Sequence, residues 1–156
     1  MENFNELLRK AYEKGIVKSL DDIFCDDLSV EKNSYLVEEE TVGYSNECKV
    51  GDIVYVRKYY YEDGRKGRNH LFVIVGEDNG EHFGMLISSD LDKLKYKDNK
   101  LLEKNSINNL SKNSIVKTDA IYRLSSENII FKIGEVEKEK LEEYKNNLKN
   151  YLIDHE

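Results

Sequence analysis

Residues 70–88 read HLFVIVGEDNGEHFGMLIS, and this stretch decides the fold. Leu71–Val75 is a continuous apolar run rich in β-branched residues, which is typical of a central strand buried on both faces. Asn79-Gly80 suits a two-residue hairpin turn, because both central positions of such a turn need positive φ. Phe83–Ser88 then predicts the returning strand. The stretch therefore predicts an antiparallel hairpin at the centre of a sheet.

Shorter patterns on either side of the hairpin extend the sheet and add a helix. Further strands are predicted at Asp52–Val56, Ser114–Thr118, Ile121–Leu124 and Ile129–Ile133. Residues 92–110, rich in Lys, Asn and Asp, predict a long polar excursion. Val136–Ile153 predicts a helix, since its apolar residues recur at a period close to 3.6. The fold class is therefore mainly β with helices (α+β): a small curled barrel with a C-terminal helix against it.

The first third of the chain has a different character. Residues 5–15 predict a short amphipathic helix with Leu7, Leu8, Ala11 and Tyr12 on its apolar face. Ser19–Asp22 resembles the N-cap of a second helix, and Ser34–Val37 is strand-like. We place a boundary near residue 45, which gives an acidic N-terminal extension (1–45) and a barrel domain (46–156).

Composition limits the class of protein. The chain has 156 residues, of which 39% are hydrophobic and 35% charged, so it is one domain and not a disordered chain. No apolar run is long enough to span a bilayer and no signal-peptide pattern is present, so we expect a cytoplasmic protein that has no membrane partner. Two cysteines without CxxC spacing indicate free or buried thiols. Three histidines outside any ligand motif predict no metal site.

Charge is distributed unevenly. Of the net charge of −7, residues 1–49 account for −6, with six Lys/Arg against twelve Asp/Glu. Residues 57–68, RKYYYEDGRKGR, carry five basic and two acidic residues, a local charge of +3. An acidic total disfavours indiscriminate nucleic-acid binding, but a basic loop of this kind can still hold phosphates.

Several segments, in this order, resemble the MazF/PemK toxin family, which shares an SH3-like barrel with the CcdB group. The segments are Gly51–Val56, the basic loop ending at Arg68, His70–Val75, Met85–Ser89, Asn113–Ile121 and Lys132–Gly134 before the terminal helix. The resemblance covers about residues 50–153 and leaves the extension unexplained.

The resemblance implies a toxin of a type II toxin–antitoxin system that acts as a metal-independent endoribonuclease on single-stranded RNA, with no cofactor. In this reaction the 2′-hydroxyl attacks the adjacent phosphate and leaves a 2′,3′-cyclic phosphate and a 5′-hydroxyl. One group must move protons, and a positive or donating group must stabilise the charge that develops on phosphorus. The family also implies a cognate antitoxin and a homodimer.

We expect the catalytic residues to be Arg68, Ser88 and His70; the resemblance implies an arginine and Ser88, and His70 is added for its chemistry. Ser88 matches the family's Thr/Ser position, although a serine there can also simply end a strand or cap a turn. The family reads Gly-x-Arg-Pro before the apolar strand, whereas this chain reads Gly67-Arg68-Asn69-His70. Asn69 therefore takes the arginine's place, and Arg68 fills the role only if the chain shifts by one residue; Arg65 is a second candidate. His70 takes the proline's place and is either a general acid or base or a histidine packed at the barrel rim.

The remaining predicted site residues would bind RNA. They are Arg57, Lys58, Tyr59, Tyr60, Arg65, Lys66, Asn69 and Asp119. The tyrosines can stack on unpaired bases or serve as half-buried covers. Asp119 can orient Arg68 or His70, or be an ordinary loop carboxylate.

Two alternatives stay open. The lost Arg-Pro signature and the acidic extension also fit a non-catalytic barrel that binds nucleic acid or protein; a CcdB-like topoisomerase poison is disfavoured, because the chain lacks that group's aromatic C-terminus. The extension itself either folds back over residues 57–68 and competes with RNA, or packs its helix on the barrel or at a dimer interface.

Overall fold

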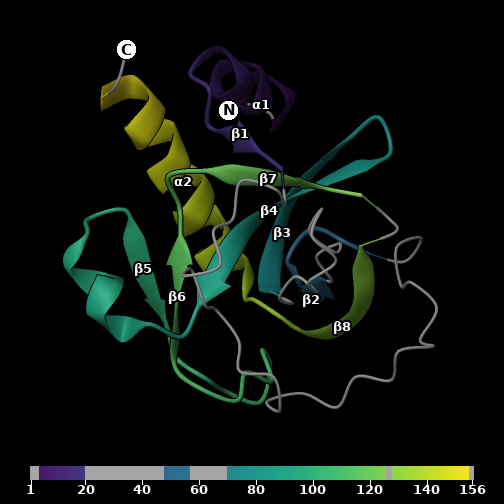
Figure 1. The fold of residues 1–156 in the computed structure, drawn as a ribbon, viewed down its shortest axis with the longest axis vertical. Coiled ribbons are helices and arrows are strands. Elements are labelled where there is room, and N and C mark those ends of the chain that lie inside the picture. Colours follow the sequence, from purple (N-terminus) through teal and green to yellow (C-terminus); the bar gives the residue numbers. More distant parts are fainter. Residues whose placement is uncertain (1–3, 20–47, 57–69, 126–127, 155–156) are drawn as a thin grey trace, which may run out of the picture.

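The computed structural model describes residues 4–19, 48–56, 70–125 and 128–154 (Figure 1). The elements in chain order are α1 (Phe4–Glu13), β1 (Val17–Lys18), β2 (Asp52–Val56), β3 (His70–Asp78), β4 (Glu81–Ser88), the 3-10 helix η3 (Leu91–Lys95), β5 (Asn99–Leu102), β6 (Ser114–Lys117), β7 (Ile121–Leu124), β8 (Ile129–Glu135) and α2 (Lys138–Asp154). The predicted α+β class, mainly β with a C-terminal helix, is confirmed.

All eight strands in the described part of the chain belong to one mixed sheet. Its main path is β1-β7-β4-β3-β2-β8, and β6 joins β4 to β5. The predicted hairpin forms its centre, with Asn79 and Gly80 both at positive φ (50° and 81°), as a two-residue turn requires. Among the described strands, β1 and β8 end the path without pairing with each other, so the sheet is open, and closure into an SH3-like barrel stays a prediction.

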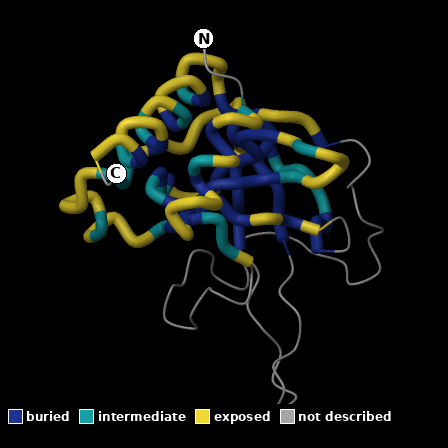
Figure 2. Tube along the Cα trace, turned by 90° about the horizontal axis from the view of Figure 1, so that it is seen from above, coloured by how far each residue is buried: buried dark blue, intermediate teal, exposed yellow. Residues whose placement is uncertain are grey.

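The sheet is buried on both faces, which explains the continuous apolar run of β3. Leu71, Val73 and Val75 point into a first core that includes α1 and α2, while Phe72 and Ile74 belong to a second core on the other face. Figure 2 shows the buried sheet beneath helices whose outer sides are exposed. The second core consists of Cys48, Val54, Val56, Phe72, Ile74, Leu86, Ala120, Tyr122, Leu124 and Ile129.

The N-terminal helix packs on the sheet. Leu7, Leu8 and Ala11 are buried in the first core, as the packing alternative for the extension predicts. The Phe4 ring lies 5.9 Å from that of Phe83 and covers Gly76, where any Cβ would overlap it. The prediction for Tyr12 is wrong: it is 49% exposed. The predicted second cap beyond Ser19, the strand-like segment 34–37 and the extension's approach to residues 57–68 lie outside the described residues.

The structure contains three elements that were not predicted from the sequence, β1, η3 and β5, and the two strands depend on distant partners. β1 is two residues long and pairs in parallel with β7. The polar excursion contains η3 and β5, and β5 exists because Asn99–Leu102 pairs with β6. After β5, the Asn108 side chain is buried; its Oδ1 accepts backbone N–H bonds and its Nδ2 donates to the Glu103 carbonyl, so the loop back to β6 is well held.

The C-terminal helix buries the predicted stripe of Leu141, Tyr144, Leu148 and Leu152. It begins at Lys138, two residues later than predicted, and the Val136 N–H instead donates to the Gly51 carbonyl at 2.9 Å. Neither helix in the described part of the chain is long and apolar enough to cross a membrane.

Candidate functional site

Ser88 is the last residue of β4 and connects the sheet to η3. It is 2% exposed and pairs with Ile115 of β6. Its Oγ accepts the Asp90 backbone N–H at 3.2 Å, so the turn-capping alternative describes a real contact. That contact uses a lone pair of the oxygen, and the hydroxyl hydrogen can still be donated elsewhere.

His70 is the first residue of β3, pairs with Val56 of β2 and is 3% exposed. The register that pairs Leu71 with Ile87 makes His70 and Ser88 the next two opposed positions on β3 and β4. Side chains at opposed positions lie on the same face, with Cβ atoms about 4.5–5.5 Å apart. Two of the predicted catalytic residues are thus brought together from neighbouring strands.

The same face continues across β6 and β5. Ile115 is opposite both Ser88 and Leu101, and two residues further along, Lys117 is opposite Asn99. Because side chains alternate along a strand, Lys117 and Asn99 share the face of His70 and Ser88. The intervening Val116 belongs to the core beneath the helices, so this polar strip lies on the face that α1 and α2 do not cover.

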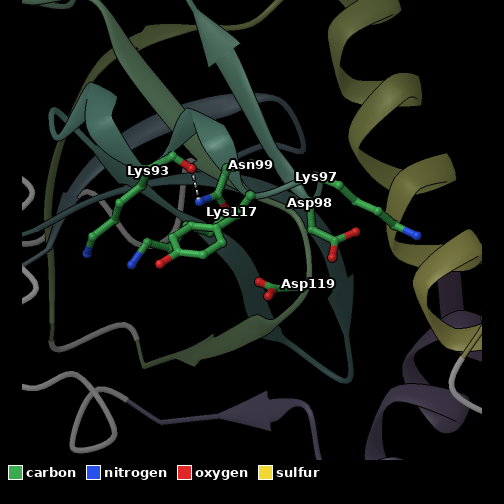
Figure 3. A pocket seen from close by; sticks show the side chains of 7 residues that line it. Lys93, Lys97, Asp98, Asn99, Lys117 and Asp119 are labelled. Carbon is green, nitrogen blue, oxygen red and sulfur yellow. Dashed lines mark hydrogen bonds between the residues drawn. The ribbon is translucent and has the colours of Figure 1, made fainter.

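A cavity of about 690 Å³ lies at the end of this strip (Figure 3). Its lining residues come from η3, the η3–β5 connection, β5 and the end of β6 with the residues after it: Lys93, Tyr96, Lys97, Asp98, Asn99, Lys117 and Asp119. In Figure 3 the Lys93 and Lys117 ammonium groups reach one side, and the Asp98 and Asp119 carboxylates occupy the other. Lys97 is directed toward α2, where it pairs with Asp154 at 3.4 Å.

Local hydrogen bonds fix the walls of the cavity. The Asn99 side chain donates to the Lys93 carbonyl at 2.9 Å, which ties β5 to η3. Thr118 is fully buried and donates both its backbone N–H (2.9 Å) and its hydroxyl (2.6 Å) to the Asp98 carbonyl. The two carboxylate-bearing segments, around Asp98 and Asp119, are therefore held against each other.

Asp119 is half-buried, and its environment changes its titration. Burial raises its pKa above the ordinary value of 3.8, and the nearby Asp98 carboxylate raises it further. A backbone hydrogen bond and the charges of Lys117 and Lys18 act in the opposite direction without cancelling the shift. Asp119 lies beyond the end of β6 and lines the cavity together with Lys117 and Asp98, so it is grouped with them rather than with His70 and Ser88.

Several predicted site residues cannot be placed. Arg68 and the predicted RNA-binding residues Arg57, Lys58, Tyr59, Tyr60, Arg65, Lys66 and Asn69 lie outside the described residues, and their roles stay predictions.

The sequence analysis missed Lys93, Tyr96, Asp98, Asn99 and Lys117. A signal was present in DKLKYKDNK (92–100), where four lysines surround a tyrosine, a combination of basic and aromatic residues that the loop at 57–68 also has, but it lies inside the polar excursion. The described residues contain no group of three or more His, Cys, Asp or Glu side chains that could hold a metal.

A known protein family matches most of the chain. Residues 49–152 match the family described as PemK-like, MazF-like toxin of type II toxin–antitoxin system. No curated protein matches the sequence. The match covers more than half of the chain, begins just before β2 and ends within α2, and leaves out α1 and β1. The chain therefore belongs to the family of PemK-like, MazF-like toxins of type II toxin–antitoxin systems.

Proposed function

We propose that this toxin is a metal-independent endoribonuclease that cleaves single-stranded RNA through attack of the 2′-hydroxyl, and that a cognate antitoxin inhibits it. The observation that carries the proposal is the β3–β4 register, in which Leu71 pairs with Ile87, so that His70 and Ser88 are the next residues on the two neighbouring strands. This pair lies on the face that α1 and α2 do not cover, close to a cavity with lysines on one side. A proton-transfer group beside a hydroxyl donor, with cations near, is what this chemistry needs.

In the proposed reaction the 2′-oxygen attacks phosphorus, and the His70 imidazole takes the proton from the 2′-hydroxyl. The new O2′–P bond forms while the P–O5′ bond breaks, and the departing 5′-oxygen takes up a proton from the protonated imidazole or from water. The Ser88 hydroxyl donates a hydrogen bond to a non-bridging oxygen, where negative charge grows in the transition state. Arg68 adds a positive charge beside the same phosphate.

The proposed reaction requires that RNA reach His70 and Ser88, which are both buried. Both side chains are at most 3% exposed, so RNA has to displace the atoms that cover them before the 2′-oxygen can reach His70. The same burial is the observation that favours the second candidate, a barrel that binds RNA or a protein without cutting it. The cleavage assay separates the two.

The test is incubation of the purified protein with a long single-stranded RNA in excess EDTA. We expect fragments with 2′,3′-cyclic phosphate and 5′-hydroxyl ends, and no cleavage by the triple variant Arg68→Ala/His70→Ala/Ser88→Ala. The matched control is Arg9→Ala/His82→Ala/Ser89→Ala, which makes the same three changes outside the proposed site. If the wild type does not cleave, or the two triple variants cleave equally, the binding module is the better account.

The proposed active form is a homodimer. A barrel of about one hundred residues buries a small core, and an isologous interface would extend it. Light scattering at micromolar concentration should give twice the mass of the 18.3 kDa chain. A monomeric mass would contradict the dimer.

A further inference from the structure

The cavity of Figure 3 has two chemically distinct ends. Lys93 and Lys117 place positive charge at one end, and Asp98 and Asp119 place carboxylates at the other. Tyr96, which is 57% exposed, adds an aromatic ring to the lining. A ligand that fits has an anion at one end, hydrogen-bond donors at the other and a flat body between. A nucleotide has this arrangement, since its phosphate, base edge and base plane supply the three features.

We propose that this cavity holds one nucleotide of the RNA substrate and selects guanine, with the Asp119 carboxylate as the group that reads the base. The inference rests on the proposed ribonuclease function, because it assigns the cavity to the same RNA strand that is cut beside Ser88.

A carboxylate selects guanine because it can only accept hydrogen bonds, and guanine offers it two adjacent donors. An ionised carboxylate has only acceptors, arranged on two oxygens side by side. The Watson–Crick edge of guanine presents two adjacent donors, N1–H and N2–H, which match both oxygens at once. Adenine and cytosine present one amino donor beside an acceptor nitrogen, and uracil presents one N–H between two carbonyls. Each of these bases would leave an acceptor facing an acceptor, and such a mismatch is costly in a half-buried site.

The cavity lies close enough to Ser88 to hold a nucleotide near the cut. Lys117 is two residues along β6 from Ile115, the residue opposite Ser88, which is about 7 Å of strand. Lys93 follows Ser88 by five residues, through the turn that Asp90 caps. The lysine end is therefore the end nearer to the cleavage site, which suits a phosphate, and the carboxylates lie further away.

Hydrogen bonds between two chain segments hold the two carboxylates at one end of the cavity. The Asp98 carbonyl is held by two bonds from Thr118, which places Asp98 and Asp119 near each other. Asp98 contributes to the negative potential, and the half-buried Asp119 makes the directional contact. The Asn99 side chain, which also lines the cavity, donates one hydrogen bond to the Lys93 carbonyl and so fixes η3 against β5.

The test measures binding of GMP, AMP, CMP and UMP to the full chain by NMR titration, which needs no cleavage. We expect GMP to bind about tenfold more tightly than the others, as one bidentate contact to a base provides. Asp119→Asn should weaken GMP to the level of the other three, while Asp92→Asn, an acid exposed on η3 outside the cavity, should leave the preference intact. The double variant Lys93→Ala/Lys117→Ala should weaken all four nucleotides equally, because it acts on the phosphate.

Equal affinity for the four nucleotides, or a GMP preference that survives Asp119→Asn in a folded variant, would overturn the inference. Chemical shift changes that avoid residues 93–99 and 117–119 would also overturn it. A clear GMP preference in a protein that fails the EDTA cleavage assay would support the cavity assignment and refute the ribonuclease proposal, so the two failures are distinguishable.

Discussion

Replacing Ser88 with alanine removes one oxygen, and the structure predicts two effects of very different size. The lost contact is a single neutral hydrogen bond, from the Asp90 N–H to Ser88 Oγ at 3.2 Å. Such a bond contributes about 1 kcal/mol to the free energy of unfolding. The proposed contact to the scissile phosphate is worth more, because removing one donor from a transition-state oxyanion costs about 10²–10³ in rate. We therefore expect Ser88→Ala to cleave RNA at least ~100-fold more slowly while losing little stability.

The assay compares single-turnover cleavage rates in EDTA with urea unfolding curves for four proteins: wild type, Ser88→Ala, Ser88→Thr and Ser89→Ala. A domain stable by about 5 kcal/mol stays more than ~99% folded after losing 1 kcal/mol, so reduced stability cannot account for a ~100-fold loss. Threonine keeps the hydroxyl and should retain most of the activity, and the neighbouring Ser89→Ala should cleave normally. A Ser88→Ala rate within about threefold of wild type would refute the catalytic role and leave Ser88 as a turn cap.

Three further predictions concern stability. Gly134→Ala should lower the free energy of unfolding in urea by about 2–4 kcal/mol, because its Cβ would overlap the Asn108 carbonyl; a variant as stable as wild type would contradict this close approach. Lys132→Met should cost about 1–3 kcal/mol in the same measurement, since Lys132 Nζ lies 3.1 Å from the buried Asp52 carboxylate, and Lys132→Arg should recover part of it. Burial raises the pKa of Asp119, so the folded state holds its proton more tightly than the unfolded state, and its ionisation lowers stability as pH rises from about 3.8 through the raised pKa. Asp119→Asn should therefore unfold at higher urea than wild type at pH 7, with the difference closing below pH 3.8; the reverse order at pH 7 would contradict this reasoning.

The parts of the fold that the sequence predicted are those with local signals. Asn79-Gly80 predicts its turn because both residues readily adopt positive φ. The spacing of the apolar residues in α2 predicts the buried face of the helix, which carries Leu141 and Leu148. The unpredicted parts depend on partners far away in the sequence. Asn99–Leu102 has no strand pattern of its own and becomes β5 by pairing with β6, and the two residues of β1 become a strand only beside β7.

The candidate site divides in the same way. Ser88 and His70 were found because a family pattern and a strand boundary marked them. The cavity lining was missed because Lys93, Asp98 and Lys117 meet only after β5 has paired with β6 and Thr118 has bonded to the Asp98 carbonyl. No local pattern shows that pairing, so a polar stretch with four lysines was indistinguishable from a solvated loop.

A β-bulge determines which serine faces His70. At the turn, Asp78 pairs with Glu81, and an uninterrupted hairpin in that register would place His70 opposite Ser89. The register shifts by one residue between Ile74 and Gly76, so that Leu71 pairs with Ile87 and His70 comes opposite Ser88 instead. A shift of one residue also exchanges the faces to which the following side chains point, and here it places His70 with Phe72 on the side opposite α1 and α2. The Phe4 ring of α1 covers Gly76 at this bulge, where no larger residue fits. The N-terminal helix, which lies outside the family match, thus packs against the irregularity that aligns the proposed catalytic pair.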